Sequence, residues 1–340
     1  MDMSNIGNLE TRMRALMDAS AIPGASLAVL RRGKVDELIA LGTRDAATGE
    51  PVTAQTVFQV ASLTKPMAAY AALQLADAGV LDLDEPLARF VPTVLPGDAA
   101  FAAITARHLL THTCGLPNLR ARNQPLKVHF QPGAWFSYSS VGFTYLQTAV
   151  EAITGEPLEA TMQRLVFEPL GMRSSSLEPQ ARFIQNFATP HEGDERVSVQ
   201  PHTANASYSL QTTAADYGAF LGAVLRGDQL KESTHLAWLA PHVHVPKGGR
   251  AEHLHAAPIE TEPDIAWGLG WGLEPTHGNF FQWGKMDGVR AFAMGSVAGQ
   301  SAVVLLTNSN KGLRLMREAA ACVLPGAHPA IGWLETCVNE

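Results

Sequence analysis

Residues 61–66 read ASLTKP and carry residue types that suit a nucleophilic reaction. Strand-like sequence gives way to helical sequence here, so Ser62 is expected at a helix N-terminus, where unpaired N–H groups favour negative charge. Lys65 follows one turn later on the same face, so its ammonium group is expected to reach the Ser62 hydroxyl. A partly desolvated lysine can activate a serine. As a bare four-residue pattern, however, an N-cap serine followed by a solvated lysine is the commoner case.

Two further segments become candidates for the same site when they are considered together with Ser62 and Lys65. Tyr138 lies between hydroxyl residues at the start of an apolar helix; alone it indicates a core aromatic, but beside a serine and lysine it is a candidate general base. Residues 281–284 read FQWG on an expected strand, followed by Lys285. Alone, Gly284 indicates only that another backbone or a ligand comes close to this strand.

The order of these three segments resembles the serine β-lactamase and penicillin-binding-protein superfamily, in its class C β-lactamase, D-alanyl-D-alanine carboxypeptidase and family VIII carboxylesterase branch. Coverage is about residues 7–325. Supporting stretches, in chain order, are PVTAQTVF (51–58), LDLDEPL (81–87), RHLLTHTCGLP (107–117), EPLGM (168–172), SLQTTAAD (209–216), GLGWG (268–272) and LTNS (306–309). Several motifs in the same order are far more specific than any one of them.

The resemblance implies a role for each matching residue. Ser62 matches the acylated nucleophile, Lys65 its lysine partner, and Tyr138 the tyrosine that exchanges protons with serine and leaving group. The backbone N–H groups of Ser62 and Lys285 are expected to form the oxyanion hole.

The substrate-binding residues implied by the resemblance are Ser140, Gln282, Trp283 and Gly284. Two of them depart from the family pattern. Ser140 stands where the tyrosine motif commonly has Asn, and Gln282 stands where the third motif usually has Lys or His. Both departures remove groups that hold the amide and carboxylate of a β-lactam.

The expected elements change in type along the chain. They are an N-terminal amphipathic helix, strands at 25–30 and 35–41 joined by a Gly-containing turn, helices at 62–79, 143–154, 158–165 and 212–225, strands at 268–273, 279–283, 289–294 and 301–307, and a last helix at about 311–324. Residues 242–263 show no period and are interpreted as a long surface excursion whose conformation the sequence does not give.

Strands at both ends of the chain and helices in the middle predict a β-lactamase/transpeptidase-like α/β fold. An antiparallel sheet flanked by terminal helices is expected from residues 1–65 and 264–340. A mainly helical insertion with the pocket loops is expected from residues 66–263. The nucleophile then lies where the two parts meet, a common place for a small-molecule pocket.

Composition excludes several classes of function. The 340 residues are 46% hydrophobic and 17% charged, which excludes intrinsic disorder as the governing property. The formal net charge of −7 makes nucleic acid an unlikely partner. Three widely spaced cysteines fit a reducing compartment, and neither a leader-like segment nor a membrane-length apolar run is present. A cytoplasmic location is expected; the oligomeric state stays open.

Other potential sites have simpler interpretations. Ser26 lies in a near miss of the nucleophile-elbow motif and is interpreted as a strand serine. The pairs His242/His244 and His253/His255 are interpreted as loop histidines, so no metal is expected. His108, His112 and Cys114 are interpreted as packing residues and an inert thiol.

These observations predict hydrolysis of a small ester or amide through a Ser62 acyl-enzyme, without a cofactor. An acyltransferase, or a D-amino-acid amidase or peptidase, remains an alternative with the same fold. A catalytically silent binding protein is a further alternative, against which the joint presence of Ser62, Lys65 and Tyr138 argues.

Overall fold

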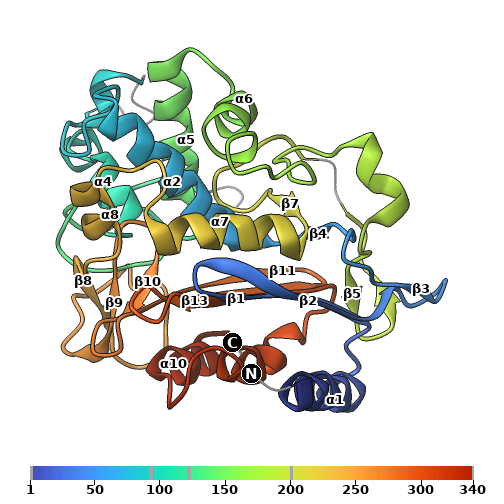
Figure 1. Ribbon diagram of the computed structural model, residues 1–340. Coiled ribbons are helices and arrows are strands. Elements are labelled where there is room, and N and C mark those ends of the chain that lie inside the picture. The colour runs from blue at the N-terminus through green and yellow to red at the C-terminus, as the bar shows by residue number, and fades with distance from the viewer. Residues whose placement is uncertain (1–2, 92–94, 96, 121–123, 200–201, 339–340) are drawn as a thin grey trace.

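The computed structural model describes residues 3–91, 95, 97–120, 124–199 and 202–338 (Figure 1). Its centre is a nine-stranded antiparallel sheet in the order β3-β2-β1-β13-β12-β11-β10-β9-β8. The sheet strands are β1 (Gly24–Arg31), β2 (Lys34–Asp45), β3 (Glu50–Pro51), β8 (Val243–Pro246), β9 (Thr261–Trp267), β10 (Gly272–Glu274), β11 (Asn279–Met286), β12 (Val289–Ser296) and β13 (Ser301–Thr307). Two small ladders pair β4 (Phe58–Gln59) with β7 (Gln211–Thr212), and β5 (His191–Glu192) with β6 (Glu195–Arg196).

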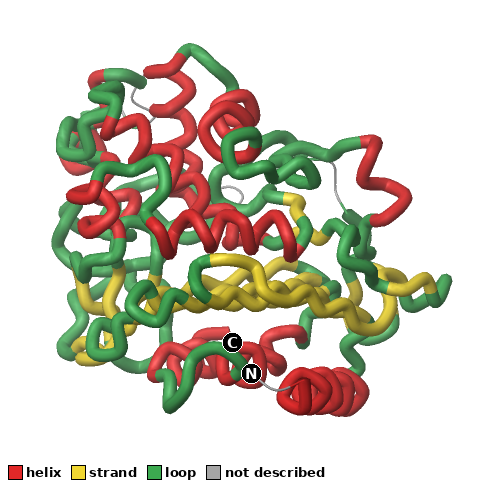
Figure 2. Tube along the Cα trace, viewed as in Figure 1, coloured by secondary structure: helices red, strands yellow, loops and turns green. Residues whose placement is uncertain are grey.

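Helices cover both faces of this sheet, as Figure 2 shows. The α-helices are α1 (Met3–Ser20), α2 (Thr64–Asp77), α3 (Ala99–Ala102), α4 (Ala106–Leu110), α5 (Ser140–Thr154), α6 (Leu158–Met162), α7 (Ala214–Arg226), α8 (Glu232–Trp238), α9 (Met316–Ala321) and α10 (Pro329–Val338). A π-helical turn (Gln163–Phe167) continues α6, and 3₁₀ turns lie at Ala61–Leu63, Leu87–Arg89, Ala181–Asn186 and Gly312–Leu315. In Figure 1, α1 and α10 lie below the sheet, whereas α7 and the other central helices lie above it.

The alternation of side chains along a strand explains the two layers. In β1, Leu27 and Val29 pack into the core shared with the terminal helices, whereas Ala28 and Leu30 pack into the core shared with α2 and α7. Because both faces are covered, β13 is buried along its whole length and reads as a continuous apolar run. This arrangement fixes the centre of the sheet, on which the functional site is built.

Most expected elements are present, with shifted ends. The β1–β2 turn has positive φ at Arg32 and Gly33, as a tight hairpin requires. The helix expected at 311–324 is instead a 3₁₀ turn followed by the short α9, and α10 was not expected at all. Of the stretch 268–273, only its last two residues, 272–273, belong to a strand, β10.

The interpretation of residues 242–263 as a surface excursion was wrong at both ends of that stretch. Residues 243–246 form β8, and residues 261–263 are the first residues of β9. The two strands pair, and β8 completes the sheet at its edge. The sheet therefore takes a strand from the segment assigned to the helical insertion. None of the helices in the described ranges is both long enough and apolar enough to cross a membrane.

Candidate active site

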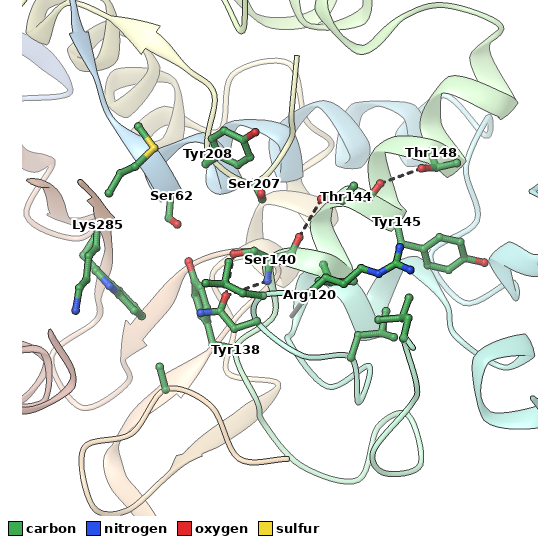
Figure 3. A pocket seen from close by; sticks show the side chains of 18 of the residues that line it. Ser62, Arg120, Tyr138, Ser140, Thr144, Tyr145, Thr148, Ser207, Tyr208 and Lys285 are labelled. Carbon is green, nitrogen blue, oxygen red and sulfur yellow. Dashed lines mark hydrogen bonds between the residues drawn. The ribbon is translucent and has the colours of Figure 1, made fainter. Parts of the chain in front are cut away.

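Ser62 lies in the 3₁₀ turn Ala61–Leu63, directly before α2. Ala61 has a φ of 47°, a left-handed conformation that is uncommon for a residue with a side chain and tends to occur at functional sites. The Thr64 hydroxyl donates to the Ala61 carbonyl at 2.7 Å and accepts from the Leu210 N–H at 3.0 Å. This turn therefore holds Ser62 in a fixed place at the floor of a cavity, where Figure 3 shows its hydroxyl.

Lys65 is fully buried, and its Nζ is surrounded by three oxygens. It contacts the Ser62 Oγ at 3.0 Å, the Ser140 Oγ at 3.0 Å and the Ser207 carbonyl oxygen at 2.8 Å. No carboxylate is among these contacts, so burial without a counter-ion lowers the pKa of Lys65 well below its usual value. The neutral amine is therefore favoured more than in a solvated lysine, and it can accept a proton from Ser62.

Tyr138 lies two residues before α5, next to the N-cap residue Ser139. The Lys65 Nζ lies 5.0 Å from the centre of its ring. Its phenol oxygen accepts a hydrogen bond from Gln282 Nε2 at 2.9 Å. Burial raises the pKa of Tyr138, and the contacts with Ser62 and Gln282 oppose this rise. The phenol is thus held as a neutral hydroxyl between Ser62 and Gln282.

His112 supports Tyr138 from behind, a role that its interpretation as a packing residue did not include. Its ring centre lies 4.2 Å from that of Tyr138, and its Nδ1 accepts the Ser139 N–H at 3.0 Å. Burial lowers the pKa of His112 well below its usual value. A neutral imidazole therefore fixes the backbone that carries Tyr138.

Ser140 faces Lys65 at the first turn of α5 and lines the cavity. Its hydroxyl donates to Asn118 Oδ1 at 2.9 Å, and its N–H donates to the same atom at 3.2 Å. Asn118 also lines the cavity, and the sequence analysis did not single it out. The stretch 107–117, which ends one residue earlier, was the available signal for this part of the site.

Gln282 does not lie where a substrate-binding residue was expected. Its side chain is fully buried and is not part of the cavity wall. Nε2 donates to the Tyr138 oxygen at 2.9 Å and to the Ser62 carbonyl at 3.1 Å. Gln282 therefore positions the two catalytic candidates from behind, because β11 directs this side chain into the protein.

Gly284 also lies behind the cavity wall. A Cβ atom at Gly284 would lie 2.2 Å from the Val60 carbonyl oxygen, so the absence of a side chain lets β11 pass beside the turn that holds Ser62. The expectation that another backbone comes close to Gly284 is confirmed. Gly284 thereby brings Trp283 and Lys285 to the same end of the cavity as Ser62.

The cavity has a volume of about 1070 Å³ and two different ends. Ser62, Trp283 and Lys285 lie at one end together with Met286, Asp287 and Arg290. Figure 3 shows Tyr145 and Thr148 at the other end, and the Arg120 side chain extends toward Tyr145. The apolar part of the cavity lining includes Leu95, Phe101, Leu116, Leu126, Val141 and Tyr145.

The family follows from a comparison with known proteins. Residues 9–325 match the family model described as Beta-lactamase. The chain belongs to the beta-lactamase family. This confirms the resemblance seen in the sequence, and two solved structures confirm the fold. A class C beta-lactamase is 22% identical with a TM-score of 0.78, over 96% of this chain and 99% of its own. An octameric penicillin-binding protein homologue from Pyrococcus abyssi is 22% identical with a TM-score of 0.75, over 92% and 74%.

Curated relatives within the beta-lactamase family have different names. Esterase EstB of Burkholderia gladioli is 33% identical over 225 residues, which are 55% of this chain and 56% of the esterase. Penicillin-binding protein 4 of Amycolatopsis lactamdurans is 31% identical over 228 residues, 62% of this chain and 59% of the relative. The chain thus spans less than two thirds of the length of both relatives.

Proposed function

We propose that this member of the beta-lactamase family hydrolyses small esters through an acyl-enzyme on Ser62. The observation that carries the proposal is the 3.0 Å contact between the Ser62 Oγ and the fully buried Lys65 Nζ, at the floor of a largely apolar cavity. A serine beside a neutral amine is an activated nucleophile.

The contacts of Ser62 support the roles of Lys65 and Tyr138, and the family resemblance supports the roles of the two backbone N–H groups. In the acylation step, Ser62 Oγ bonds to the substrate carbonyl carbon while the Lys65 amine takes its proton. Tyr138, whose phenol is held neutral beside Ser62, donates a proton to the leaving alkoxide and recovers one from Lys65. The N–H groups of Ser62 and Lys285 are assigned to the developing oxyanion. In the deacylation step, water takes the place of the alcohol and the proton transfers run in reverse. The bond between Ser62 Oγ and the acyl carbon breaks, and the acid is released.

The lining of the cavity favours a neutral ester. Aliphatic and aromatic side chains in the cavity lining suit an acyl or alcohol group without charge. Esterase EstB, among the relatives of this chain, agrees with this choice. An acyltransferase, or an amidase or peptidase for D-amino acids, needs the same three residues and remains the alternative. The cytoplasmic location also remains a prediction.

Covalent labelling tests this proposal. Intact mass spectrometry after incubation with a fluorophosphonate is expected to show one adduct, and peptide mapping is expected to place it on Ser62. Release of p-nitrophenol from esters of graded chain length then measures turnover on the same sample. An adduct on Ser26, the strand serine of the near-miss motif, would overturn the assignment. Transfer of the acyl group to an added alcohol in preference to water would favour the acyltransferase.

A further inference from the structure

The shortest contact of the Lys65 amine is with a backbone group. Its Nζ lies 2.8 Å from the Ser207 carbonyl oxygen, whereas the hydroxyl oxygens of Ser62 and Ser140 both lie at 3.0 Å. A carbonyl oxygen can only accept a hydrogen bond, so Lys65 must donate one N–H to Ser207 in either protonation state. This carbonyl therefore limits the directions that the remaining groups on Nζ can take.

The neighbouring hydroxyl limits these directions further. The Ser140 hydroxyl donates its single proton to Asn118 Oδ1 at 2.9 Å, so it can only accept from Lys65. A neutral amine has two N–H groups and one lone pair. With one N–H directed to Ser207 and the other to Ser140, the lone pair faces the Ser62 Oγ. This is the direction that a base needs in order to take the serine proton.

Asn205 holds the residue that supplies this carbonyl. Its Oδ1 accepts two hydrogen bonds from Ser207, from the backbone N–H at 2.8 Å and from the hydroxyl at 2.6 Å. The Asn205 backbone is held in turn, because its N–H donates to Ser209 Oγ at 2.7 Å. Ser207 lines the cavity, and Asn205 is not one of the described residues that do so. Asn205 thus acts on Lys65 through Ser207 and does not meet a substrate.

The loop around Asn205 is tied to α5. The Gln147 carboxamide bonds to both neighbours of Asn205, accepting the Ala206 N–H at 3.1 Å and donating to the Ala204 carbonyl at 3.0 Å. Asn205 Nδ2 adds a longer contact with Thr144 Oγ1 at 3.4 Å. The first residue of α5 supplies one of the other oxygens, so a single helix places two of the three oxygens around the buried amine.

We propose that Asn205 is a positioning residue, which keeps the Ser207 carbonyl oxygen on the Lys65 amine. This contact directs the lone pair of the amine at Ser62. The inference rests on the proposed Ser62 acyl-enzyme and adds a residue that controls how its base is oriented. Without the Asn205 carboxamide, Ser207 is free to turn its carbonyl away. An N–H of Lys65 can then face Ser62, and the serine is activated less often.

Loss of the carbonyl contact also changes the pH dependence of the base. A carbonyl acceptor stabilises the ammonium form more than the neutral amine, so its loss lowers the pKa of Lys65 further. The titratable groups around the amine are Tyr138, whose ring centre lies 5.0 Å from Nζ, and His112, while Lys285 of β11 lines the same end of the cavity. Burial raises the pKa of Tyr138 and lowers that of His112, which favours the neutral form of both. Asn205→Ala should therefore react more slowly and yet keep its reactivity to lower pH.

The rate at which a fluorophosphonate labels Ser62, measured across a pH series, tests this without a known substrate. In this reaction Ser62 Oγ bonds to phosphorus, fluoride leaves, and the serine proton passes to Lys65. The variants are Asn205→Ala and Asn205→Asp, the second of which keeps an oxygen acceptor for Ser207. The control is Ser209→Ala, which loosens the same loop but leaves both bonds from Ser207 to Asn205 in place. Asn205 is half-buried, so Asn205→Ala is expected to fold.

Asn205→Ala is expected to lower the plateau labelling rate about ten- to a hundredfold and to move the acidic limb to lower pH. Asn205→Asp should stay within about threefold of the wild-type plateau without a shift to lower pH, and Ser209→Ala should keep the wild-type acidic limb. A wild-type rate in Asn205→Ala, or a slower rate with an unmoved limb, overturns the inference while Ser62 is still labelled, as does an equal shift in Ser209→Ala. If the wild type is not labelled at Ser62, the proposed nucleophile fails, and the inference fails with it.

Discussion

The two walls of the cavity differ in how they are held. The wall that carries Ser62 and Tyr138 is built from buried groups locked by hydrogen bonds, with Lys65 and Gln282 fully enclosed. The opposite wall, from Asn118 to Arg120 and along α5, is partly exposed, and Leu119 is 75% exposed. Loss of a reacting group from the first wall should affect every substrate equally, whereas changes in the second wall should affect substrates differently.

The largest effect is expected from Ser62→Ala, which removes the nucleophile itself. Turnover of every ester should fall to background, since the Ser140 hydroxyl, which also contacts Lys65, donates to Asn118 Oδ1 and does not lie in the turn before α2. The fold should persist, because the Ser62 side chain makes no cap of α2 and the change removes one oxygen. Thermal unfolding of the variant is the control. Residual turnover that differs between esters would contradict the uniform role of this wall.

Lys65→Ala should lower kcat/KM by about a thousandfold or more, the upper range for a proton-transfer group. In the wild type, burial lowers the pKa of Lys65, so the neutral base persists to lower pH than in a solvated lysine. Activity should therefore fall as pH decreases through this lowered pKa, and stability should fall on acidification below 10.5, because the unfolded lysine binds the proton more tightly. A pH–rate profile that keeps the same acidic limb in Lys65→Ala would assign that limb to another group.

Tyr138→Phe should lower kcat at least about a hundredfold with every ester. The change keeps the ring against His112 and removes the oxygen that contacts Gln282, so KM should change little. The matched control is Tyr145→Phe, which removes a phenol oxygen at the far end of the same cavity. Rates near those of the wild type in Tyr138→Phe would exclude its role in proton transfer.

The difference between the walls also explains what the sequence could predict. Ser62 and Lys65 are one helical turn apart, so local spacing alone predicted their contact. His112 was interpreted only as a packing residue and Asn118 was not singled out, because both reach the site by tertiary packing and not by local spacing. Gln282 was placed in the cavity because a motif gives residue types along a strand, whereas the pairing of the strand decides which face each side chain takes.

The same reasoning applies to the fold. The strand expected at 301–307 was found with the same bounds, because a buried central strand is a continuous apolar run between turn residues. Helix α10 was missed, although Ala330, Ile331 and Leu334 follow helical spacing and pack against the sheet. β8 was missed because an edge strand of four residues with two histidines and prolines nearby has little alternation to detect.

The smallest effect is expected in the ratio of kcat/KM for neutral esters to kcat/KM for β-lactams. A β-lactam carboxylate needs a charge-assisted hydrogen bond, which the Lys or His of the third motif usually helps to supply. Here the residue is Gln282, which is neutral and turned toward Tyr138 and the Ser62 carbonyl. Arg290 is nearby, but its NH1 donates to the carbonyls of Met286 and Val289.

Loss of one charge-assisted hydrogen bond costs roughly 1.5–3 kcal/mol, or about ten- to a hundredfold in kcat/KM. Short-chain neutral esters should therefore exceed penicillin G and cephalothin by at least that factor, measured on one purified sample. Gln282→Lys should narrow the gap if the added cation reaches the cavity, and Gln282→Glu should widen it. Equal rates for esters and β-lactams in the wild type would show that the charged end of the cavity already binds a carboxylate, and that the neutral Gln282 does not set this preference.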